Sequence, residues 1–151
     1  MLAIGRRKRT ARLYPSRSDG RELYARTVPL LTSLGLISLA LGGVSGWLVL
    51  AATQKGDWFR SHGVPAPRRF LQLHIDWIMM GLVLIAVQTV APGMPNWIRA
   101  LIAFGAMVNP ILFAPLVWGQ QVTQNPFYRA LTIVSFTSMS VGLPALAIWA
   151  V

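Results

Sequence analysis

The chain has 151 residues, of which 54% are hydrophobic and only four are acidic, and it contains no cysteine. A soluble domain of this size would need more polar surface, and the lack of cysteine excludes disulfides, thiolate haem ligation and cysteine-based metal sites. The net charge of +10 would suit nucleic-acid binding, but neither interleaved aromatic residues nor a recognisable nucleic-acid module accompanies it. We therefore expect a membrane protein that binds no nucleic acid.

Residues 1–27 form a basic N-terminal arm. Its eight cationic residues outnumber the two acidic ones and are Arg6, Arg7, Lys8, Arg9, Arg12, Arg17, Arg21 and Arg26. Directly before a membrane span, such an arm is typical of a cytoplasmic anchor that contacts anionic lipid headgroups. The apolar stretch that follows is longer than the roughly 7–15 residues of a signal-peptide core, so we expect it to remain uncleaved.

Four apolar stretches follow the arm, at about residues 28–53, 70–91, 97–118 and 130–151. Each is close to the roughly 20 residues that a helix needs to cross a bilayer. The predicted fold class is therefore all-α, a transmembrane four-helix bundle that forms one domain over residues 28–151. With the arm inside, both termini are cytoplasmic, and nine Lys and Arg residues lie inside against five outside. This bias favours a multi-pass protein of the cytoplasmic (inner) membrane.

Small residues and prolines mark the helices at which close packing or bending is expected. The first stretch contains Gly42-x3-Gly46, a spacing that lets two helix backbones approach closely. The third contains Asn109 followed by Pro110, and a proline inside a helix frees a backbone carbonyl.

The second apolar stretch carries an unusual set of polar residues. At 100° per residue, His74, Gly81 and Gln88 share one helical face, whereas Asp76 lies about 200° from His74. The two side chains therefore cannot pair within their own helix. We expect Asp76 to meet Arg69, Arg68 or a polar group of a neighbouring helix. Gly81 would make room beside His74 for a flat ligand or, equally, for another helix.

Other interpretations of this stretch stay open. A histidine in the first turn of a membrane helix also fits an ordinary interfacial side chain, and Asp76 fits a lone polar group that a basic neighbour satisfies. A proton or ion relay through His74 and Asp76 is an alternative, although one acid and one histidine are few for a relay. The two histidines and Asp76 do not have the spacing of a closed metal-ligand set.

The segment from His74 to Ala86 resembles the second span of the hydroxylaminobenzene mutase and styrene oxide isomerase group of small four-span membrane proteins. Those proteins carry a histidine, a glycine seven residues later and an alanine twelve residues later in an apolar run, and the mutases often have an acid at the position of Asp76. In the third span, Gly105-Ala-Met-Val-Asn109 is similar to their Gly-x3-Asn pattern. The resemblance covers roughly residues 30–150 and leaves out the basic arm.

This resemblance implies a site and a cofactor. Styrene oxide isomerases use haem b, and the matching iron ligand here is His74, with Gly81 admitting the macrocycle. The resemblance also implies Asn109 and Asp76 as catalytic residues for an intramolecular isomerisation of a small apolar substrate, in a homo-oligomer that would be a trimer. Neutral imidazole is a common axial haem ligand, which agrees with this assignment.

Two positions depart from the pattern of that group. An asparagine expected six residues after the histidine is Met80, and a tyrosine expected four residues after Asn109 is Phe113. Neither replacement supplies an oriented hydrogen bond. The sequence therefore leaves two functions open, a membrane isomerase or mutase and a non-enzymatic accessory or haem-binding subunit of a larger membrane complex.

Overall fold

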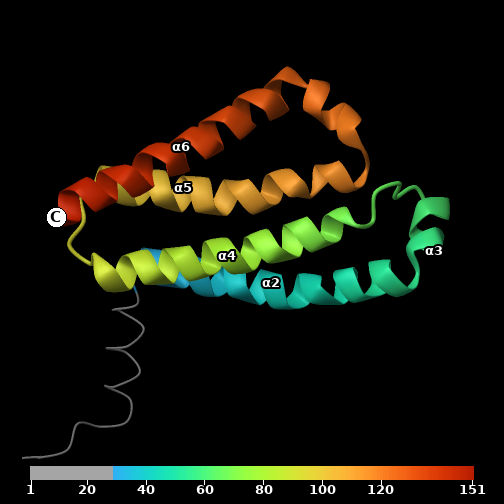
Figure 1. The fold of residues 1–151 in the computed structure, drawn as a ribbon, viewed down its shortest axis with the longest axis horizontal. Coiled ribbons are helices and arrows are strands. Elements are labelled where there is room, and N and C mark those ends of the chain that lie inside the picture. The colour runs from blue at the N-terminus through green and yellow to red at the C-terminus, as the bar shows by residue number, and fades with distance from the viewer. Residues whose placement is uncertain (1–28) are drawn as a thin grey trace, which may run out of the picture.

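The computed structural model describes residues 29–151, and all of the regular structure within that range is helical (Figure 1). The helices are α2 (Leu30–Gln54), α3 (Gly56–Ser61), α4 (Arg69–Val90), α5 (Asn96–Phe113), the short 3-10 helices η1 (Pro115–Val117) and η2 (Gln120–Gln124), and α6 (Pro126–Ala150). Four segments are long and apolar enough to cross a membrane: α2, α4, α5 with η1, and α6. The all-α, four-span prediction is confirmed. The basic arm and its predicted cytoplasmic location lie outside the described residues.

The third predicted span, residues 97–118, agrees with the apolar segment Asn96–Val117, although that segment is not one continuous α-helix, and the fourth span begins earlier than predicted. α5 ends at Phe113 rather than near residue 118, because Pro115 has no N–H with which to continue the helix and starts η1 instead. α6 begins at Pro126 rather than near residue 130. There the Asn125 side chain caps the helix by accepting hydrogen bonds from the backbone N–H groups of Phe127 and Tyr128, at 2.9 and 3.4 Å.

The four long helices form an open row in the order α2, α4, α5, α6 (Figure 1). Each packs against its neighbours in the row, and α6 touches neither α2 nor α4 in the described part of the chain. The outer faces of α2 and α6 carry exposed apolar side chains, among them Val44 at 69% and Ile133 at 63% exposure. Surfaces of this kind suit contact with lipid.

The buried core lies near the end of the bundle that carries the loop between α4 and α5. Its side chains come from the start of α2, the end of α4, this loop and the first part of α5, and they are Leu31, Leu84, Val87, Ala91, Met94, Ile98, Ile102 and Ala106. At the opposite end, α5 and α6 separate toward the two 3-10 helices (Figure 1). His74 and Asp76, near the start of α4, therefore lie away from this core.

Glycines bring α2 and α4 into backbone contact. A Cβ atom added to Gly35 would lie 2.8 Å from the carbonyl oxygen of Gly81, and one added to Gly81 would lie 2.9 Å from the carbonyl oxygen of Gly35. Real Cβ atoms do not approach backbone oxygens so closely, and the two positions therefore require the absence of a side chain. The close packing that small residues predicted for the first span is present in the structure.

Candidate functional site

His74 lies near the start of α4, partly buried, and its ring rests on α2. Its Nδ1 atom is 2.8 Å from the carbonyl oxygen of Gly42. Because a carbonyl oxygen can only accept a hydrogen bond, Nδ1 must carry the proton and donate it. In a neutral imidazole the lone pair then resides on Nε2, which has no hydrogen-bond partner among the described residues.

Small residues on α2 create the space for this ring. A Cβ atom added to Gly46 would lie 3.3 Å from Cε1 of His74, so the ring occupies the groove that the missing side chain leaves. Ser45, between the two glycines, donates its hydroxyl to the Gly42 carbonyl at 2.8 Å and lies 3.3 Å from His74 Nδ1. In the sequence Ser45 is marked only as one of the small residues around the Gly42-x3-Gly46 spacing, and nothing there predicts its contact with His74.

Asp76 faces the other neighbour of α4. The side-chain amide of Asn109, on α5, donates from Nδ2 to Asp76 Oδ2 at 2.9 Å. Asp76 forms no salt bridge with any described residue, so its partner is a polar group of a neighbouring helix and neither Arg68 nor Arg69. The Asn109 amide nitrogen is the donor of this bond and the Asp76 carboxyl oxygen is its acceptor.

Asn109 is buried, with 8% of its surface exposed, and only one end of its amide is paired. Its Oδ1 atom has no hydrogen-bond partner among the described residues. A buried amide with one orphaned end is energetically costly. Its contact with the carboxylate makes Asn109 a group that can position Asp76.

The structure separates the predicted site residues into two groups. His74 contacts α2, whereas Asp76 and Asn109 meet between α4 and α5. This agrees with the helical geometry that excluded a His–Asp pair within α4. Within a single chain, Asp76 and Asn109 are therefore in contact with each other, and His74 contacts neither of them.

Gly81 packs directly against α2. A Cβ atom added there would lie 2.9 Å from both the Gly35 carbonyl oxygen and the Leu39 Cγ atom. Of the two uses predicted for this position, a neighbouring helix takes the space at Gly81 itself. Gln88, on the same stripe, is buried at 7% exposure.

Whether these residues suit haem depends on His74 as an iron ligand and on the space at Gly81. Histidines that ligate metals commonly donate their second ring N–H to a backbone carbonyl, which fixes the ring and makes the ligating nitrogen more basic. His74 has this arrangement and fits an axial ligand. Gly81 does not fit the role of admitting the macrocycle. Residues 29–151 contain no cluster of three or more His, Cys, Asp or Glu side chains, so His74 is the donor to consider.

No protein-family model, curated protein or solved structure matches this chain.

Proposed function

We propose that this chain is a membrane-embedded haem b protein of the hydroxylaminobenzene mutase and styrene oxide isomerase type, with His74 as the axial ligand. The observation that carries the proposal is the hydrogen bond from His74 Nδ1 to the Gly42 carbonyl at 2.8 Å. It leaves Nε2 without a hydrogen-bond partner among the described residues, in a segment composed mainly of apolar residues. When bound, haem would supply a Lewis-acidic ferric iron for the rearrangement of a small apolar substrate.

The residues of the chain have distinct tasks in this proposal. The Gly42 carbonyl accepts the hydrogen bond from Nδ1–H of His74, and the groove at Gly46 fixes the plane of the ring. Asp76 is only partly buried and has one carboxylate oxygen without a described partner, so it can contact a substrate that enters from lipid. Asn109 acts through Asp76 as a positioning residue.

The separation of His74 from Asp76 favours a homo-oligomer for an active isomerase. The two side chains belong to opposite sides of α4, toward α2 and toward α5. A site that uses both groups would therefore combine His74 of one copy with Asp76 of another. The open row of helices leaves the outer faces of α2 and α6 available for such an assembly.

An absorption spectrum of the purified full-length protein tests the cofactor. We expect a Soret band that is lost in His74→Ala, because this change removes the only histidine in a span. The matched control is His62→Ala, since His62 is exposed and its Nδ1 contacts the carbonyl of Trp58, one turn earlier in α3. A colourless protein that folds, or equal loss of the band in both variants, would overturn the haem proposal.

A second candidate, a non-enzymatic haem-binding subunit of a larger complex, is favoured by the pairing of Asp76 with Asn109. Met80 packs against the core, and Phe113 lines a cavity of about 490 Å³ between α5 and α6. Neither side chain can supply an oriented hydrogen bond. Purification in mild detergent separates the two candidates, because a stoichiometric partner of different sequence supports the subunit and a homo-oligomer supports the enzyme.

A further inference from the structure

The end of the bundle at which α2 ends and α4 begins is strongly basic. It contains the end of α2, the whole of α3, the start of α4 and the start of α6 (Figure 1), and its cationic residues are Lys55, Arg60, Arg68, Arg69 and Arg129. Asp57 is the only acidic residue described at this end. It pairs with Arg60 across one turn of α3, and both side chains are largely exposed, at 98% and 53%. The end therefore keeps a clear excess of positive charge.

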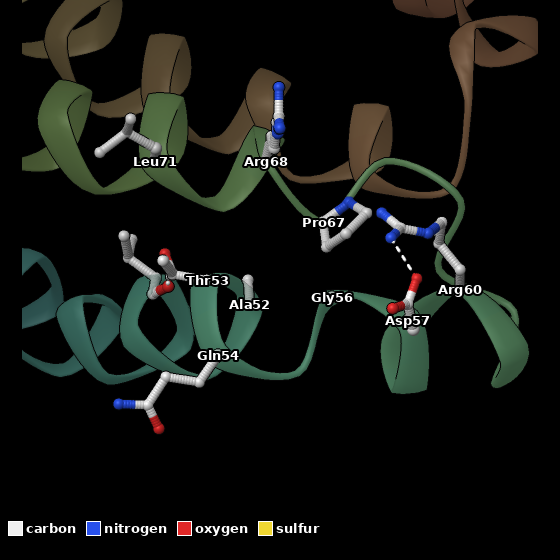
Figure 2. A pocket seen from close by; sticks show the side chains of 10 residues that line it. Ala52, Thr53, Gln54, Gly56, Asp57, Arg60, Pro67, Arg68 and Leu71 are labelled. Atoms are coloured by element: carbon white, nitrogen blue, oxygen red, sulfur yellow. Dashed lines mark hydrogen bonds and ion pairs between the residues drawn. The ribbon is translucent and has the colours of Figure 1, made fainter.

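A cavity of about 440 Å³ lies at this end, between the last turns of α2 and the first turn of α4. Figure 2 shows the residues that line this cavity. Ala52 and Thr53 belong to α2, Leu71 belongs to the first turn of α4, and Arg68 directly precedes that helix. The Asp57–Arg60 pair lies beside Pro67. A second hollow of about 570 Å³ adjoins it. The two share Arg60, Pro67, Arg68 and Leu71, and the second adds Arg69.

The lining of the cavity changes from cationic to apolar along the direction of the membrane helices. Arg60 and Arg68 lie outside the spans, whereas Val49 and Leu71 lie within α2 and α4. Arg68 is exposed and makes no side-chain hydrogen bond or ion pair with any described residue. Its guanidinium is thus available to an anion, and guanidinium groups bind phosphate through paired N–H donors.

The neighbouring α3 has features of a segment at the membrane surface. Trp58 is 54% exposed, and its ring stacks on that of His62 with centroids 4.2 Å apart. Exposed tryptophans are enriched at the level of lipid headgroups. The cavity therefore lies at the depth where a phospholipid has its phosphate, with the acyl region next to the apolar part of the lining.

We propose that this cavity binds an anionic phospholipid, whose phosphate contacts Arg68 and Arg60 and whose acyl chains follow Val49 and Leu71. The match rests on charge complementarity and on the order of polar and apolar groups along the cavity. The proposal is independent of haem and of any isomerase activity, and it uses no residue of the basic arm. Asp57 opposes the bound phosphate and limits its affinity.

The test is native mass spectrometry of the full-length protein from micelles that contain equal amounts of phosphatidylglycerol and phosphatidylcholine. We expect wild type to retain phosphatidylglycerol in preference to phosphatidylcholine. Arg68→Gln should lower that preference about fivefold, the effect of about 1 kcal/mol per basic residue near an anionic surface. Asp57→Asn should raise it, because it removes the negative charge next to Arg60 and the arginine remains.

The matched control is Arg129→Gln, which removes the same charge from the same end of the molecule but outside this cavity. The basic arm is present in every variant and contributes equally to all of them. Equal losses in Arg68→Gln and Arg129→Gln would show that only general surface charge attracts the lipid. Retention of added inorganic phosphate together with equal retention of the two lipids would show a phosphate site without a lipid. Either outcome overturns the proposal.

Discussion

The two faces of α4 satisfy their polar groups in different ways. On the face toward α2, glycines bring backbone against backbone, and His74 is bonded to the main chain at Gly42. On the face toward α5, the polar contact joins two side chains, Asp76 and Asn109. The first arrangement leaves a ring nitrogen unpaired at a partly exposed position, whereas the second leaves the orphaned Asn109 Oδ1 in the interior. The α2 face therefore offers a ligand atom, and the α5 face holds a polar pair in place.

The largest effect is expected from Gly81→Ala on the α2 face. The added Cβ would meet a backbone oxygen at 2.9 Å, and a backbone cannot rotate away as a flexible side chain can. The two helices must separate, and overpacking of this kind costs about 1–3 kcal/mol. The free energy of unfolding, measured by titration with SDS from a mild detergent, should fall by that amount.

Gly43→Ala is the control for this substitution. Gly43 lies on the same stretch of α2 as Gly42, but nothing is within 4 Å of its added Cβ. The change should leave stability unaltered or raise it by about 0.5–1 kcal/mol, the preference of a helix for alanine over glycine. If Gly81→Ala behaved like Gly43→Ala, the backbone contact between α2 and α4 would be refuted.

On the α5 face, a double-mutant cycle of Asp76→Ala and Asn109→Ala should reveal a smaller coupling. Hydrogen bonds between membrane helices average about 0.6 kcal/mol and reach about 1.7 kcal/mol. Asp76→Ala should cost more than Asn109→Ala, because it leaves the whole buried amide unpaired, whereas Asn109→Ala also removes the orphaned Oδ1. SDS titration of the four proteins measures the cycle, and effects that add to within about 0.3 kcal/mol would argue against the hydrogen bond.

The membrane helices could be predicted from the sequence because long apolar runs determine them directly. The direction of Asp76 relative to His74 followed from 100° per residue, and the structure agrees. The helix that each residue faces could not be predicted, because it depends on which pairs of helices pack. Ser45 and the Gly42 carbonyl illustrate this, since only the packing of α4 on α2 brings them to His74. The early end of α5 depended on Pro115, whose effect the hydropathy pattern did not reveal.

The smallest effect is expected from Gly46→Ala, which tests how firmly the α2 face holds His74. The added Cβ would lie 3.3 Å from Cε1 of the ring, a contact that the ring can relieve by moving a few tenths of an ångström. Stability should change by less than about 0.5 kcal/mol. The movement should nevertheless weaken the bond from Nδ1 to the Gly42 carbonyl and shift the ¹⁵N resonances of the ring. Gly43→Ala should leave those resonances in place. Unchanged spectra in Gly46→Ala would mean that the ring is not held in the groove, and that its tautomer is set by something other than the backbone of α2.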